Sequence, residues 1–216
     1  FKHFGQLQQR ATDPEAQFIS SKEPLLLTTF NNTTKDAGFA QLNPSFKSLP
    51  IQLAEGSYMY NLEAKARNAE QIIFTRQSFT EYGDLWYSKL DFASPTKLSN
   101  ANPQMDKYLW GSVELVSWVD FNRDTIQGLL YKPENFDSNK KYPMMVYFYE
   151  RHTDNLHRHY VPAPGRSVIC PTFYTSNDYL VFMPDIKYTE GLPGRSAYDA
   201  IISGTMAMVN RGFADV

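Results

Sequence analysis

Residues 143–149 read PMMVYFY, and residues 179–183 read YLVFM. Neither run alternates apolar with polar residues, which is typical of strands that are covered on both faces. A hairpin is predicted just before them, from VELVSWVDF at residues 113–121 and TIQGLLYK at residues 125–132, with a polar turn between. Together these stretches predict a buried sheet in the second half of the chain.

A helix is predicted after the second apolar run. Ser196, with Asp199 three residues later, matches a capping box. Apolar and small residues then recur at helical spacing before Gly212: Ala197, Ile201, Thr205, Met208 and Val209. The polar, proline-bearing segment 150–166 is predicted to be an irregular loop. The order hairpin, strand, strand, helix predicts the opening of an α/β sheet covered by helices.

The first half of the chain contains a weak repeat. LLLTTF at residues 25–30 and IIFTRQ at residues 72–77 are each followed by a polar turn, an aromatic-containing run and a Pro-x-x-Leu phrase. The spacing is 47 residues from Leu26 to Ile73 and 45 from Leu53 to Leu98. A period in the forties with strands and turns inside it is typical of β-propeller blades. Two hairpins of an ordinary β-sandwich are the alternative.

Composition excludes several classes of protein. Lys and Arg number 21 against 23 acidic residues, a net charge of -2, so no nucleic acid or anionic membrane is expected as a partner. The single cysteine, Cys170, excludes an intramolecular disulfide and a multi-cysteine metal site, and it is expected to be a small buried side chain. The longest apolar run is far below the roughly 20 residues of a membrane span.

Two phrases in the second half resemble a known family. LLYKPENFDSNKKYPMMVYFY at residues 129–149 and YLVFMPDIKYTEGLPGRSAY at residues 179–198 are similar to the start of the catalytic domain in the prolyl oligopeptidase family of serine peptidases. Within it, the bacterial dipeptidyl-peptidase-like members are the most similar. The resemblance implies a β-propeller in front of an α/β-hydrolase domain. We therefore expect the last propeller blades in residues 1–110 and the start of the hydrolase domain in residues 111–216, both incomplete.

The nucleophile that this fold needs is absent from the pattern. An α/β-hydrolase presents its serine in a G-x-S-x-G turn, with acid and base later in the chain. The sequences around Ser167 and Ser196 match only the first half of that motif, since neither has the second glycine. In the resembled family the turn follows the strand after the helix that here ends near Gly212. The chain is therefore expected to be an interior fragment, inactive alone, with the triad beyond Val216.

One candidate site residue, Tyr149, is implied by the resemblance. Family members donate one oxyanion hydrogen bond from a tyrosine at the end of the strand that follows the phrase K-K-Y-P, which is KKYP at residues 140–143 here. Glu150 and Arg151 depart from the small residues and Gly-Pro that often follow in the family. The alternative is an aromatic side chain at a strand end that packs against a loop.

Other polar residues are expected to be structural. His152, His157 and His159 lie near Asp154 and could bind zinc, but no helix register fixes their geometry, so no metal and no cofactor is expected. Asp185 follows the second apolar run and precedes the expected nucleophile. Because the acid follows the serine in hydrolase order, Asp185 is expected to support a loop.

The leading functional hypothesis is that the chain is part of a serine peptidase that cleaves short peptides through an acyl-enzyme. The propeller would then filter peptides by size. The alternatives are a non-catalytic propeller-type module that binds peptides or a partner, and an esterase on the same fold. Uncovered strand edges and the helix face around Ile201 and Met208 predict self-association of the chain, or contact with the rest of a longer one. The resemblance favours the periplasm or cell envelope over the cytoplasm.

Overall fold

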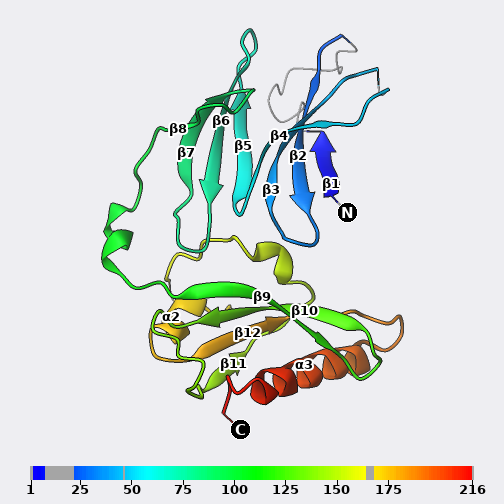
Figure 1. Cartoon of the computed structure of the whole chain (residues 1–216), viewed down its shortest axis with the longest axis vertical. Helices are drawn as coiled ribbons and strands as arrows, with labels where there is room; N and C mark the ends of the chain where they lie inside the picture. Colours follow the sequence, from blue (N-terminus) through cyan, green and yellow to red (C-terminus); the bar gives the residue numbers. More distant parts are fainter. Residues whose placement is uncertain (1, 8–21, 46, 164–167, 216) are drawn as a thin grey trace. The chain divides into compact units, whose positions relative to one another are not determined.

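A computed structural model describes residues 2–7, 22–45, 47–163 and 168–215. The chain divides into two compact units, which are described separately below. Unit 1 comprises residues 1–103 and 157–159, and unit 2 comprises residues 104–156 and 160–216. Figure 1 gives the strand and helix labels.

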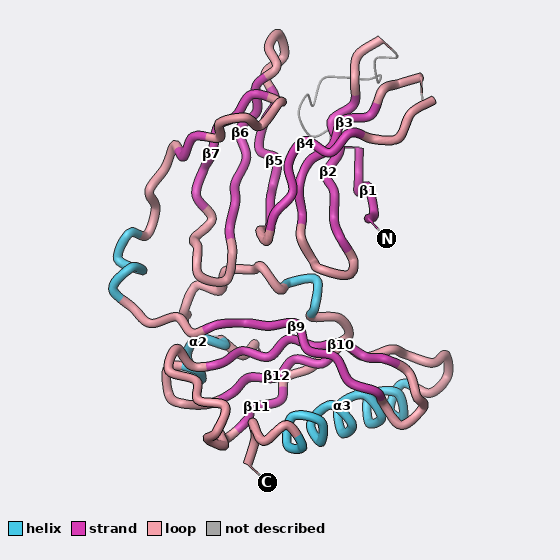
Figure 2. Tube along the Cα trace, viewed as in Figure 1, coloured by secondary structure: helices cyan, strands magenta, loops and turns pink. Residues whose placement is uncertain are grey.

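Unit 1 contains two four-stranded antiparallel sheets. The first consists of β1 (Lys2–Leu7), β2 (Leu25–Asn31), β3 (Ala37–Leu42) and β4 (Ile51–Gly56); the second consists of β5 (Met59–Lys65), β6 (Gln71–Gln77), β7 (Asp84–Lys89) and β8 (Thr96–Lys97). Strands that are consecutive in sequence are neighbours in each sheet, so each is a meander (Figure 2). Two successive meanders of this kind confirm the predicted strand-and-turn repeat. The sequence pattern missed the first strand of each meander, β1 and β5.

The core of unit 1 takes residues from both of its sheets. Leu26 and Phe39 come from the first sheet, and Ile72 and Phe74 from the second. The Phe39 ring packs edge-on against Phe74 with centroids 5.8 Å apart, a favourable aromatic geometry. Ile72 is buried in this core, whereas Ile73, with which Leu26 was aligned in the repeat, is half-buried.

Unit 2 contains a mixed four-stranded sheet. Its order is β11 (Met144–Val146), β12 (Leu180–Pro184), β10 (Thr125–Lys132) and β9 (Ser112–Val119). The β9–β10 and β10–β12 pairs are antiparallel and the β11–β12 pair is parallel. The predicted hairpin and the predicted second strand are confirmed, and all five residues of β12 are buried.

The predicted strand at residues 143–149 is wrong at its C-terminal end. Only Met144–Val146 pair as a strand, and they are half-buried. The Tyr147 amide makes one more bond, to the Phe182 carbonyl at 3.0 Å, and the chain then leaves the sheet. Phe148 and Tyr149 are consequently exposed.

Three short helices lie before the sheet in sequence or between its strands β11 and β12. They are η1 (Pro103–Lys107), η2 (Thr153–Asn155) and α2 (Pro171–Thr175), and η2 is the only helix or strand within the described part of the predicted loop 150–166. Cys170 precedes α2, and its sulfur lies 3.1 Å from the Thr172 hydroxyl. Its side chain is half-buried, so the expected burial is only partial. Among the described residues, no helix is both long and apolar enough to span a membrane.

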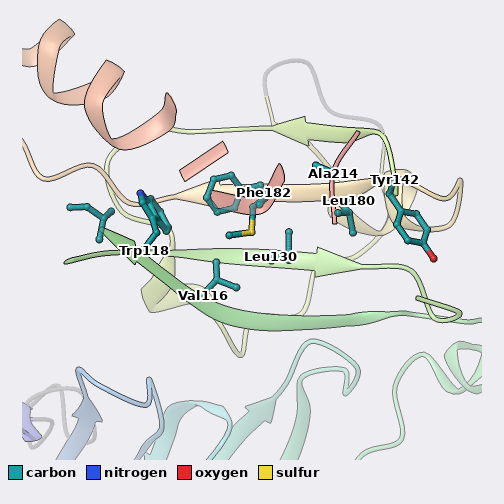
Figure 3. Close-up of a cluster of buried hydrophobic side chains, with 9 residues drawn as sticks. Val116, Trp118, Leu130, Tyr142, Leu180, Phe182 and Ala214 are labelled. Carbon is teal, nitrogen blue, oxygen red and sulfur yellow. The ribbon is translucent and has the colours of Figure 1, made fainter. Parts of the chain in front are cut away.

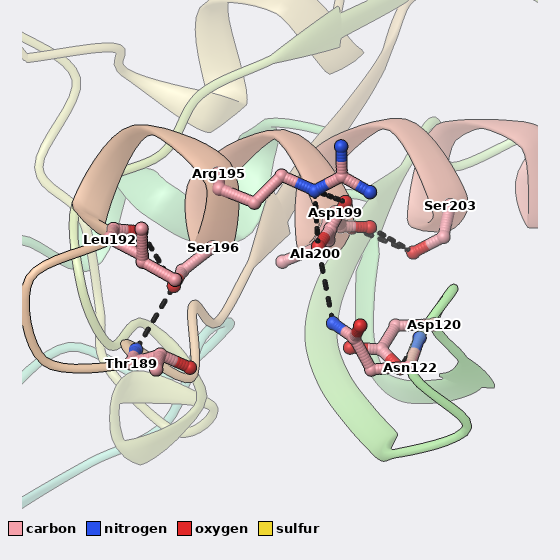
Figure 4. A network of polar contacts seen from close by, with 9 residues as sticks. All are labelled: Asp120, Asn122, Thr189, Leu192, Arg195, Ser196, Asp199, Ala200 and Ser203. Atoms are coloured by element: carbon pink, nitrogen blue, oxygen red, sulfur yellow. Dashed lines mark hydrogen bonds and ion pairs between the residues drawn. The ribbon is translucent and has the colours of Figure 1, made fainter.

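The long helix α3 (Pro193–Asn210) begins three residues before Ser196, so the predicted capping box is wrong. Pro193 occupies the first turn, where its missing N–H costs nothing and its fixed φ suits the helix. The Ser196 hydroxyl instead donates to the Leu192 carbonyl at 2.9 Å and accepts from the Thr189 amide at 3.0 Å (Figure 4). Ser196 therefore fixes the loop that enters the helix.

Asp199 connects α3 to the β9–β10 turn. This carboxylate is buried. It accepts a hydrogen bond from the side-chain amide of Asn122 at 3.1 Å and pairs with the Arg195 guanidinium at 3.0 Å (Figure 4). The turn needs a left-handed residue, Arg123, at φ 68°. The second member of the predicted capping box thus binds a turn instead of the helix N-terminus.

Small residues let α3 approach the sheet closely. The Trp118 indole N–H donates to the Ser203 hydroxyl at 2.9 Å, and its ring lies over Gly204. The core beneath contains Val116, Trp118, Ile126, Leu130, Tyr142, Leu180, Phe182, Met208 and Ala214 (Figure 3). Met208 is fully buried, so the predicted uncovered face is wrong there. The exposed large hydrophobic residues of α3 are Tyr198, Ile202 and Met206.

Gly204→Ala should weaken this packing. The added Cβ would lie 2.7 Å from the Trp118 ring and 2.9 Å from the Phe182 ring, and such overpacking costs about 1–3 kcal/mol. Gly194, in the first turn of α3, has open space around its Cα, so Gly194→Ala is the matched control. In urea unfolding, Gly204→Ala should be the less stable of the two by about 1–3 kcal/mol. Equal midpoints would contradict the close approach.

Candidate functional site

Tyr149, the candidate oxyanion donor, lies three residues past the end of β11. Its side chain is 76% exposed, so its hydroxyl is accessible to a ligand. Its backbone carbonyl accepts a hydrogen bond from the Tyr188 hydroxyl at 3.3 Å.

Asp185 supports the segment that follows Tyr149. Its carboxylate accepts hydrogen bonds from the His152 amide at 2.6 Å, from the Thr153 amide at 3.0 Å and from the Thr153 hydroxyl. The next amide, of Ile186, donates to the Glu150 carbonyl at 2.8 Å. These bonds agree with the expected role of Asp185 in loop structure.

Of the two serines in the incomplete motifs, Ser196 does not have the surroundings of a nucleophile. Ser196 is buried in the first turns of α3, where its hydroxyl is used by the Leu192 and Thr189 backbone. Ser167 lies outside the described residues. The structure therefore gives Ser196 a structural role, in holding the loop that enters α3.

A serine, an aspartate and a histidine lie close together in unit 1, but the aspartate lies between the other two, which is not the arrangement of a catalytic triad. The Ser57 hydroxyl donates to the Asp36 carboxylate at 2.9 Å, and His157 Nε2 lies 3.3 Å from the same oxygen. A catalytic triad needs the imidazole between the serine and the carboxylate, so that it can take the serine proton. This trio can stabilise a turn but cannot activate a nucleophile.

The three loop histidines are held separately. His159 Nδ1 lies 3.0 Å from the Phe79 carbonyl, His157 contacts Asp36, and the His152 ring packs on Tyr147 with centroids 5.4 Å apart. Among the described residues, no group of three or more His, Cys, Asp or Glu side chains is arranged to hold a metal ion.

Burial lowers the pKa of each of these histidines below its ordinary value. The Asp185 charge opposes this effect at His152, the Asp36 carboxylate opposes it at His157, and the Phe79 carbonyl opposes it at His159. Burial is the larger effect in each case because a charged imidazole loses more hydration than these single partners return. The neutral imidazole is therefore the folded form at neutral pH.

Sequence reasoning nominated Tyr149 as a candidate and did not single out Tyr188. The motif phrase gives the position of Tyr149, whereas a tyrosine in a polar loop carries no signal that its hydroxyl reaches a backbone carbonyl 39 residues earlier. Chemically, the described site supplies one exposed hydroxyl donor on a supported loop.

No protein-family model matches the sequence, and no curated protein matches it significantly. Solved structures do match. The chain superposes on the AtxE2 isopeptidase with a TM-score of 0.67 and 13% identity, over 90% of this chain and 32% of that one. It superposes on Porphyromonas gingivalis dipeptidyl peptidase 4 with a TM-score of 0.66 and 13% identity, over 91% and 29%.

A third similar structure is a putative dipeptidyl aminopeptidase IV from Bacteroides ovatus, with a TM-score of 0.64 and 16% identity over 92% of this chain and 29% of that chain. The chain thus spans about 30% of the length of the structures that it matches. At these identities the comparison establishes the fold. The structural resemblance to dipeptidyl-peptidase-like proteins that the sequence phrases predict is confirmed.

The histidines should titrate below their ordinary range. In the unfolded chain they take up a proton near pH 6.5, whereas the folded chain resists protonation. Their contribution to the free energy of unfolding is therefore complete above pH 6.5 and is lost as pH falls below it, at up to about 1.4 kcal/mol per pH unit for each histidine.

NMR titration of the ring protons should give midpoints below 6.5 for His152, His157 and His159 in the folded chain. Single His→Gln variants assign the signals. Each should also reduce the fall in the free energy of unfolding as the pH drops below 6.5. Midpoints at or above 6.5 would show that the rings are not buried as described.

Proposed function

We propose that this chain is part of a serine peptidase of the prolyl oligopeptidase family that, when intact, cleaves short peptides through an acyl-enzyme. The family phrases at residues 129–149 and 179–198 support this proposal. So does the fold likeness to peptidase structures over about nine-tenths of the chain. Unit 1 would be the last propeller blades, and unit 2 the start of the α/β-hydrolase domain.

The return of the chain to the sheet after α3 is the observation that carries the proposal. Ala214 forms a parallel bridge with Tyr142, just before β11. The Tyr142 amide donates to the Phe213 carbonyl at 2.9 Å, and the Asp215 amide donates to the Tyr142 carbonyl at 3.0 Å. A parallel strand would continue from here, and an α/β-hydrolase carries its nucleophile on the turn after such a strand.

In the proposed mechanism, a serine past Val216 attacks the peptide carbonyl and a histidine takes its proton. The carbonyl oxygen becomes an oxyanion, and the Tyr149 hydroxyl donates a hydrogen bond to it, together with a backbone N–H beside the serine. Collapse of this intermediate expels the amine, which receives the proton from the histidine, and leaves the acyl-enzyme. Water then releases the acid. Tyr149 contributes because a preorganised donor stabilises charge that develops only in the transition state.

The 216-residue chain alone should be inactive. It should hydrolyse no Xaa-Pro or Xaa-Ala amide, and a fluorophosphonate probe should label no serine in it, because the reactive serine belongs to the turn after the next strand. The full-length protein should be labelled and should hydrolyse these amides. Stable labelling within residues 1–216 would refute the proposal; labelling with ester hydrolysis only would favour an esterase.

Tyr149→Phe in the full-length protein should lower kcat about 100-fold and leave KM nearly unchanged, because one oxyanion donor is lost. Tyr179→Phe is the matched control. Tyr179 is also exposed, but it lies just before the start of β12, whereas Tyr149 follows the end of the parallel strand β11. Steady-state kinetics on a dipeptidyl chromogenic amide measures both. Unchanged turnover in Tyr149→Phe would remove this residue from the mechanism.

A further inference from the structure

Tyr149 is on backbone that the sheet does not hold. The last ladder bond of the β11 side is from the Tyr147 amide to the Phe182 carbonyl, and the next residues leave the strand. An exposed side chain has few packing contacts to fix it, so the direction of its hydroxyl depends on the backbone beneath. Whatever holds residues 149–153 therefore sets the position of that hydroxyl.

The segment that follows β12 provides this support. The Asp185 amide donates to the Gln127 carbonyl at 2.9 Å, so Asp185 is itself held by β10. Its carboxylate receives the His152 and Thr153 amides, and Thr153 is fully buried. Hydrogen bonds from backbone N–H groups to a carboxylate are stronger than neutral ones. The carboxylate thus fixes the downstream end of residues 149–153, the Tyr149 loop, to the sheet.

Two further bonds hold the loop at and beside Tyr149. The Ile186 amide donates to the Glu150 carbonyl at 2.8 Å, and the Tyr188 hydroxyl donates to the Tyr149 carbonyl at 3.3 Å. All of these contacts come from residues 185–188. A role limited to stabilising η2 would need only the Asp185 bonds, whereas the Tyr188 bond acts on the candidate donor itself.

We infer that Asp185 and Tyr188 are positioning residues that orient the Tyr149 hydroxyl toward the oxyanion of the peptide substrate. The inference rests on the proposed role of Tyr149. Neither residue touches the substrate; each acts on the backbone that carries Tyr149. Because a misplacement of about 1 Å can cost about 100-fold in rate, small losses of support are measurable.

The test is a set of double-mutant cycles in the full-length protein. Asp185→Asn should lower kcat about tenfold and Tyr188→Phe about threefold, with KM nearly constant, because only the donor geometry changes. In a Tyr149→Phe background each should have less than about a twofold further effect, since the hydroxyl that they orient is gone. Tyr188 is exposed, so Tyr188→Phe should fold even if Asp185→Asn does not.

Asp124→Asn is the matched control. Asp124 pairs with Lys187 of the same segment at 2.9 Å, and both side chains are largely exposed. Within residues 185–188, the described hydrogen bonds to residues 149–153 involve Asp185, Ile186 and Tyr188, so loss of the Asp124 pair should not change kcat. Thermal midpoints of all variants show whether a loss of rate is a loss of folding.

The outcomes separate the two proposals. If Tyr149→Phe turns over normally, the role of Tyr149 fails and the positioning inference is overturned with it. If Tyr149→Phe is slow but Asp185→Asn and Tyr188→Phe are not, or if their effects multiply in full with that of Tyr149→Phe, only the positioning inference is overturned.

Discussion

Strand β12 fixes the position of the elements around it in unit 2. It pairs with β10 on one side and β11 on the other, and its five residues are buried. Trp118 and Phe182 pack edge-on with ring centroids 5.3 Å apart and lie beneath Gly204 of α3. Where β12 ends, the chain continues into Asp185, which holds the loop after β11. The packing of one buried strand is thereby connected to the geometry of the candidate site.

Apolar runs made the sheet of unit 2 predictable, but helix α3 was only partly so. Continuous burial of residues 180–184 left a clear signal, and the polar turn between two strand-forming runs marked the hairpin before them. The buried face of α3 carries Ser203 and Gly204, which a search for apolar spacing overlooks. Their small volume is useful only because Trp118 lies opposite, and this pairing of β9 with α3 is a tertiary contact that local pattern does not contain.

In the candidate site, too, the sequence indicated individual residues but not the contacts between them. Tyr149 was found because a family phrase gives its position, and Asp185 because it ends an apolar run. Their connection was not predictable, since the bonds join residues more than 30 positions apart through backbone amides that every residue has. In unit 1, the repeat predicted the strands that carry Leu26 and Phe74 but missed β5, whose mixed exposure hides its pairing with β6.

The pairing pattern has a consequence for the order in which the chain folds. The sheets of unit 1 are meanders, and after the β1–β2 pair each hairpin joins residues close in sequence and closes a short loop. The parallel pair of β11 and β12 must bring residue 144 to residue 180, and the bridge of Tyr142 to Ala214 closes a longer loop still. Loop-closure entropy makes such non-local contacts slow to form. We therefore expect the sheets of unit 1 to be complete while the β11 edge of the unit 2 sheet, with the segment that carries Tyr149, is still assembling.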